Sequence, residues 1–162
     1  MAYKGFLKIA MGQGTRAFTL VECEYQFHRE VNENGTPKGG VTGGRIIATV
    51  VTPQKNLFMY KWLFEEKLEN GFVEINNSQN EPHYIMFERA RCVDIYEYFN
   101  GHSKDMMISR LTIQCPEMGF YGFNEDSFAY DFRLQFSRTI NPNSYAGAIS
   151  REDYMLEAVQ TM

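Results

Sequence analysis

The sequence predicts a mainly β protein: a small closed or nearly closed antiparallel β-barrel with one inserted α-helix and a short C-terminal helix. Aromatic residues make up 15% of the 162 residues, and flat rings favour the pleated surface of a sheet. Most segments alternate apolar and polar residues, as half-buried strands do. A long helical pattern occurs only at about 53–69. A chain of this length can bury one hydrophobic core without disulfides or a structural metal.

Composition excludes several classes of protein. The net charge is −4, whereas proteins that neutralise phosphates carry a basic excess, so we expect no nucleic-acid partner. No apolar run approaches the roughly 20 residues of a spanning helix, so we expect no membrane insertion. The N-terminus lacks the apolar stretch of about 7–15 residues that marks a signal peptide, which predicts a cytoplasmic protein. Cys23, Cys92 and Cys115 are expected to be reduced and buried.

The first strands are predicted at Lys4–Ala10 and Arg16–Val31. In the second of these, the apolar positions begin as Phe18 and Leu20 and then shift by one residue at Val21. Because successive side chains of a strand point to opposite faces, a one-residue shift predicts a bulge or sharp bend there.

A glycine-rich stretch follows, N-E-N-G-T-P-K-G-G-V-T-G-G at 32–44. It has no hydrophobic period and is expected to be a long loop between two strands. Loops of this length in compact domains are usually functional or disordered.

The central strand and the helix come next. Arg45–Thr52 is apolar on both faces, which predicts a strand covered on both sides. Thr52 and Pro53 form an N-cap followed by proline at the first helical position, and Asn70-Gly71 is a C-terminal glycine signal. The predicted apolar stripe consists of Leu57, Tyr60, Lys61, Phe64 and Leu68, widened by Phe58, Trp62 and Leu63. This helix is expected to pack deeply against a sheet.

After the helix, strands are predicted at Phe72–Asn76, His83–Phe99, Met106–Cys115 and Ser127–Phe136. Residues 3–137 are therefore expected to form the barrel domain and 138–162 a C-terminal extension. In the extension, Ser150 and Asp153 resemble a capping box, which predicts a helix over about 151–160.

No motif predicts catalysis, a metal or a cofactor. His28, His83 and His102 have no Cys or His partner at metal-binding spacing. Cys92 with a histidine as base leaves a hydrolase open as an alternative. A cysteine within an aromatic strand is more often a core residue.

Three segments resemble one known family. The first is G-G-V-T-G-G-R-I-I-A-T-V-V-T-P, followed by L-F-M-Y-K-W-L-F; the others are F-E-R-A-R-C-V-D-I-Y-E-Y-F-N at 87–100 and M-I-S-R-L-T-I-Q-C-P at 107–116. In this order and spacing, the chain resembles a divergent branch or paralogue of the haemolysin-coregulated protein family, the tube subunits of the type VI secretion system. Gly43, Gly44, Leu57 and Trp62 stand in the places of the family's structural motif.

The resemblance implies a β-barrel flanked by a helix, six copies of which close into a ring. Rings stack into a tube that a contractile sheath propels, and small effectors travel in the lumen. The implied partners are other copies of the chain, the sheath, spike and baseplate proteins, and the effectors. The implied role is structural and not enzymatic, without a cofactor, and export occurs through the machine without a signal peptide. Ring stacking is expected of the loop residues Asn34, Gly35, Thr36, Pro37, Lys38, Gly39, Gly40, Val41 and Thr42.

Two further alternatives stay open at the level of the sequence. A phage-like tail-tube or baseplate protein shares the barrel-and-ring architecture. A monomeric β-domain would use its aromatic residues as a platform for a small ligand.

Overall fold

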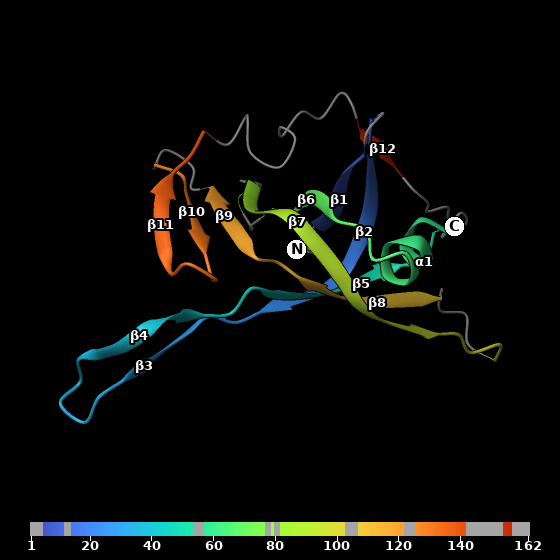
Figure 1. Cartoon of the computed structure of the whole chain (residues 1–162). Helices are drawn as coiled ribbons and strands as arrows, with labels where there is room; N and C mark the ends of the chain where they lie inside the picture. The colour runs from blue at the N-terminus through green and yellow to red at the C-terminus, as the bar shows by residue number, and fades with distance from the viewer. Residues whose placement is uncertain are drawn as a thin grey trace.

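The structure is a computed structural model that describes residues 5–11, 14–53, 57–76, 79, 82–102, 107–121, 126–141 and 154–156. In chain order, the elements (Figure 1) are β1 (Gly5–Met11), β2 (Gly14–Tyr25), β3 (His28–Val31), β4 (Pro37–Thr42), β5 (Arg45–Val51), α1 (Leu57–Phe64), β6 (Glu69–Asn76), β7 (Pro82–Tyr98), β8 (Ile108–Gln114), β9 (Glu117–Tyr121), β10 (Phe128–Asp131), β11 (Phe136–Thr139) and β12 (Tyr154–Leu156).

Six strands close into an antiparallel barrel, in the order β7, β6, β1, β2, β5 and β8, because β8 pairs back with β7. Strands β9, β10 and β11 continue the sheet outward from the first half of β7. The predicted β-barrel with an inserted helix is therefore confirmed. Closure gives β1, β5, β6 and β8 a pairing strand on both sides, whereas the second halves of β2 and β7 pair with β5 and β8, respectively, on one side.

Strand β7 joins two parts of the sheet because two bulges bend it. Glu88 and Arg89 together oppose the single residue Asn70 of β6, and Val93 is an extra residue opposite β8. Bulges bend a strand and increase its twist. The first half of β7 therefore pairs with β6 and β9, and the second half turns away to pair with β8.

The predicted irregularity in the second strand is also confirmed. The register between β2 and β5 shifts between Leu20 and Glu22. The intervening Val21 is 57% exposed although it is apolar. This bulge moves Cys23 and Tyr25 onto the core side, where both pack against the buried cluster.

The core fills the barrel and includes one face of α1. Its fully enclosed side chains come from all parts of the barrel and include Leu7, Ile9, Phe18, Ile46, Trp62, Val73, Phe87, Leu111 and Ile113. The free cysteines Cys92 and Cys115 are buried, and Cys23 is partly buried. They serve as small apolar residues, as predicted.

The helix is shorter than the predicted 53–69. Pro53 precedes α1, and residues 54–56 lie outside the described part. At the other end, Glu66 has a φ of 52°, which ends the helix, and Glu69 already belongs to β6. The predicted terminating glycine, Gly71, is a strand residue: a β-carbon there would lie 2.3 Å from the Lys8 carbonyl oxygen. Close approach of two backbones requires this glycine.

The centre of the predicted apolar stripe is wrong by a rotation of about one residue, although Phe58 and Trp62, predicted to widen the stripe, are indeed buried. The buried residues are Phe58, Met59 and Trp62, whereas Leu57 and Phe64 are 68% and 76% exposed. Since α1 is apolar almost all round, its period alone does not determine which side faces the barrel.

Two hairpins stand where the sequence predicted unbroken strands and a loop. Arg16–Val31 is interrupted at Gln26 and Phe27, and the predicted loop contains β4, which pairs with β3. Ser127–Phe136 is also no single strand, since β10 ends at Asp131 and β11 runs back beside it. Strand β9 was not predicted. Strand β4 could not be predicted from hydrophobic alternation, because its glycines, proline and lysine are exposed on both faces of the strand.

The predicted C-terminal helix is wrong over the part that is described. Tyr154–Leu156 form β12, which pairs in parallel with Thr15–Ala17 of β2. The first half of β2 has β1 on its other side, so backbone pairing there overrides the local helical pattern. The remaining residues of the predicted helix lie outside the described part of the chain.

Candidate assembly surfaces

A two-stranded arm projects from the barrel (Figure 1). It consists of residues 28–42, with β3 and β4 joined by a turn, and its strands pair only with each other. Every residue of β3 is exposed, and in β4 only Gly40 and Val41 are partly covered. At about 3.3 Å per residue, the arm extends roughly 20 Å. Its side chains contribute almost nothing to the core.

Hydrogen bonds shape the tip of the arm. The Asn32 backbone N–H donates to the Thr36 carbonyl oxygen at 2.8 Å, and the Thr36 N–H donates to Asn34 Oδ1 at 3.1 Å. Gly35 has a φ of +87°, a conformation that glycine adopts without strain. Side chains that bond to their own turn hold the tip in one shape.

The base of the arm is fixed to the outer strands. Gly44 has a φ of +86°, and its carbonyl oxygen accepts the Cys115 N–H at 2.6 Å. The Tyr130 hydroxyl accepts the Val41 N–H at 3.1 Å. The Phe27 ring stacks on Phe132 with centroids 6.2 Å apart. The arm is therefore held at its base, although its strands have no other neighbour.

The residues predicted for ring stacking and those of the predicted structural motif lie in different parts of the structure. Asn34, Gly35 and Thr36 lie in the turn of the arm, the residues Pro37–Thr42 form β4, and Gly43 and Gly44 form the joint at its base. Trp62 is 1% exposed in the core, and its indole N–H donates to the Ala90 carbonyl oxygen at 3.2 Å. Leu57 lies on the exposed side of α1, away from this cluster.

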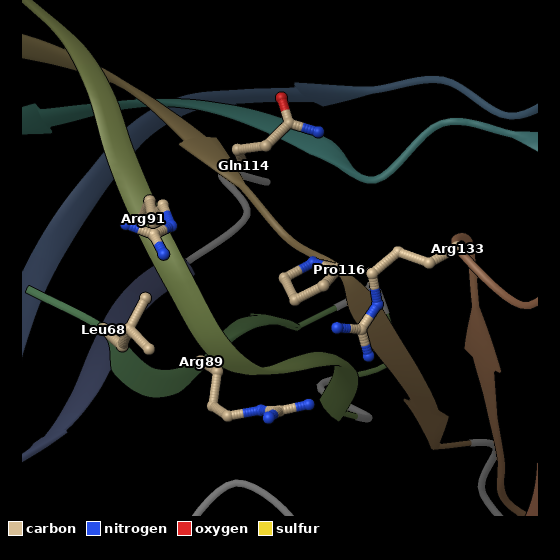
Figure 2. A pocket seen from close by; sticks show the side chains of 6 residues that line it. All are labelled: Leu68, Arg89, Arg91, Gln114, Pro116 and Arg133. Atoms are coloured by element: carbon tan, nitrogen blue, oxygen red, sulfur yellow. The ribbon is translucent and has the colours of Figure 1, made fainter. Parts of the chain in front are cut away.

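A basic hollow of about 440 Å³ lies where β7 leaves β9 for β8 (Figure 2). We call it the arginine hollow; it is lined by Leu68, Arg89, Arg91, Gln114, Pro116 and Arg133. Sequence reasoning missed it, because Arg133 is distant in sequence from the other two arginines. The only available signal was the spacing of Arg89 and Arg91, which places both on one side of a strand.

The third arginine is oriented by a buried carboxylate. Arg133 donates from Nη2 to Asp131 Oδ2 at 3.1 Å, and the backbone N–H groups of Arg133 and Leu134 donate to Oδ1 at 2.8 and 2.9 Å. The Arg133 side chain, followed by these backbone donors, lowers the pKa of Asp131 against the opposing effect of burial. This network shapes the turn between β10 and β11.

The geometry gives no support to a nucleophilic Cys92. Burial raises the pKa of its thiol to about 11, and a protonated thiol is a poor nucleophile. His28, His83 and His102 are all exposed. Among the described residues, no group of three His, Cys, Asp or Glu side chains is placed to hold a metal. None of the described helices has the length and apolar character to cross a membrane.

A closed β-barrel whose projecting arm is exposed and pairs only with itself has the form of a subunit of a larger assembly. The chain belongs to the hemolysin coregulated protein family Hcp (TssD), whose family model matches residues 1–127. It is thus a tube subunit of the type VI secretion system. The family is secreted and structural rather than enzymatic. A search of curated proteins found no match.

Solved structures with the same fold have low sequence identity. A type six secretion system protein matches with a TM-score of 0.72 at 10% identity, covering 85% of this chain and 100% of that one. Hcp1 from Salmonella typhimurium matches with a TM-score of 0.67 at 12% identity, covering 86% and 100%. Hcp1 from Flavobacterium johnsoniae matches with a TM-score of 0.62 at 18% identity, covering 79% and 98%.

Proposed function

We propose that this tube subunit closes into rings of six copies and that the arm of each copy bridges one ring to the next. The observation that carries the proposal is the arm itself. It is long, exposed on both faces and paired only within itself. A segment that adds nothing to its own core, yet is shaped at its tip and fixed at its base, is suited to contacts outside the chain.

The chemistry of the arm supports stacking. Val31 is 62% exposed, and a β-carbon on Gly39 would meet nothing within 4 Å. An exposed two-stranded ribbon has free edges, which offer backbone N–H and C=O groups to a partner. Adjacent rings supply such partners repeatedly, which explains why the arm does not fold back on its own barrel.

The partners and the export route that we propose are those of a tube subunit. The sheath, spike and baseplate proteins of the machine are its proposed partners, with small effector proteins in the lumen. We further propose synthesis in the cytoplasm and export by the machine without a signal peptide. We propose that 138–162 is a C-terminal extension of the barrel domain, which it contacts through the end of β11 and through β12.

Shortening the arm tests the proposal. His28 and Thr42 are cross-strand partners, so Asn-Gly in place of residues 29–41 would close a two-residue hairpin. We expect the variant to fold and to form rings by native mass spectrometry, but to show no stacked tubes by negative-stain electron microscopy. Leu57→Ser, which alters an equally exposed apolar residue off the arm, is the control and should keep the tubes. Tubes from the shortened protein, or a wild-type protein that is monomeric at tens of micromolar, would contradict the proposal.

A further inference from the structure

The arginine hollow is lined by three arginines, and two of them have no ion-pair partner among the described residues. Among the described residues, the guanidinium groups of Arg89 and Arg91 have no ion-pair partner, and no carboxylate lines the hollow. Arg133 forms an ion pair with Asp131 and also lies near Glu117, which pairs with Arg138. Figure 2 shows the three arginine side chains reaching the hollow from β7 and from the turn after β10.

The backbone of Arg89 has an energetically unfavourable conformation. Its φ of 53° is in the left-handed region, which is unfavourable for a side chain other than glycine by about 1–2 kcal/mol. The Arg89 backbone N–H donates to Asn70 Oδ1 at 2.8 Å, which holds the bulge. Bulges re-aim side chains, and here the result is that Arg89 and Arg91 both face the hollow.

Guanidinium groups prefer bidentate contacts with carboxylates. The same chain presents two exposed carboxylates on the outer side of β2, Glu22 and Glu24. We call this pair the acidic strip. Within the described residues neither has an ion-pair partner. Arg45 lies near Glu24 around a second hollow of about 420 Å³ but makes no ion pair with it.

The topology places these two surfaces at opposite edges of one four-stranded part of the barrel, in which β5 and β8 separate Glu22 and Glu24 of β2 from Arg91 of β7. Going round the six strands, β2 is separated from β7 by β6 and β1 in one direction and by β5 and β8 in the other. A ring needs a head-to-tail contact, in which two different surfaces of one chain complement each other. Opposite charges at the two opposite edges of this sheet satisfy that requirement.

We propose that the arginine hollow of one copy receives the acidic strip, Glu22 and Glu24, of the next copy around the ring. This inference rests on the proposed ring and adds the charged contact that closes it. The contact determines register and direction, because two hollows or two strips facing each other would repel.

Charge reversal on each side tests the contact. Arg91→Glu and Glu24→Arg both alter exposed residues, so each variant should fold with a wild-type circular dichroism spectrum. Each alone should lose its rings, measured by native mass spectrometry at concentrations where the wild type is fully assembled. Mixed one to one, the variants restore complementary charge at every contact, so alternating closed rings with three copies of each should form. Lys38→Glu makes the same charge change on the arm and should keep its rings.

The outcomes separate this inference from the ring itself. A wild-type protein without rings would overturn the proposed function and the contact together. Wild-type rings with intact Arg91→Glu rings would overturn only the contact. Loss of rings in Arg91→Glu without recovery in the mixture would also overturn it, because the hollow would then serve a surface other than the acidic strip.

Discussion

The barrel and the arm of this chain use their residues in opposite ways. In the barrel, side chains such as Leu7, Ile46 and Ile113 are fully enclosed, and the strands β1, β5, β6 and β8 each pair with a strand on both sides. In the arm, every residue of β3 is exposed and the ribbon has two free edges. The difference shows that the barrel carries the stability of the fold, whereas the arm carries surface for other molecules.

The largest expected effect comes from Trp62, which fixes α1 to the barrel and so tests whether the barrel carries the stability. Trp62→Ala should lower the free energy of unfolding by about 3–5 kcal/mol, because it empties a fully buried site and removes the hydrogen bond to Ala90. Chemical denaturation measures the loss. Leu57→Ala, on the exposed side of the same helix, should change stability by less than about 0.5 kcal/mol. Near-wild-type stability of the Trp62 variant would show that the helix does not support the barrel.

Two crowded glycines compare the barrel with the arm directly. A β-carbon on Gly71 would meet the Lys8 carbonyl oxygen at 2.3 Å, whereas one on Gly40 would meet the Gln135 side chain at 2.7 Å. The backbone of β1 cannot move aside, but a glutamine side chain can. Gly71→Ala should therefore cost about 1–3 kcal/mol, and Gly40→Ala about 0.5 kcal/mol or less. Equal costs would mean that the arm is packed as rigidly as the barrel.

The turn between β10 and β11, where Tyr130 and Phe132 contact the base of the arm, should respond to pH. Because the pKa of Asp131 is lowered in the folded state, its contribution to stability is present above the unfolded value of about 3.9. It is lost as the pH falls through the lower folded pKa. Asp131→Asn keeps a side-chain oxygen that can accept from the backbone N–H groups of Arg133 and Leu134 but loses the ion pair with Arg133, and it should cost about 1 kcal/mol at neutral pH. Thermal midpoints of the two proteins should converge on acidification; a constant gap down to about pH 2 would contradict this cause.

Regular alternation and composition were enough to predict the barrel strands and the bulge at Val21. Both are local features, since strand period is readable wherever one face is buried. Strand β4 was not predictable in this way, because its residues contact almost no core and its pairing comes only from β3. The hairpin at Asp131 was hidden because the alternation of aromatic residues continues across the turn.

The sequence by itself determined the β class, the inserted helix, the reduced cysteines and the position of the glycine-rich segment proposed for assembly. Tertiary structure alone decided which face of α1 is buried, since an almost wholly apolar helix has no preferred side until the barrel supplies one. It also placed Tyr154–Leu156, in the middle of the predicted C-terminal helix, in β12 by pairing them with β2. The arginine hollow required the whole fold, because a bulge in β7 and a turn after β10 bring residues distant in sequence together only after the barrel has closed.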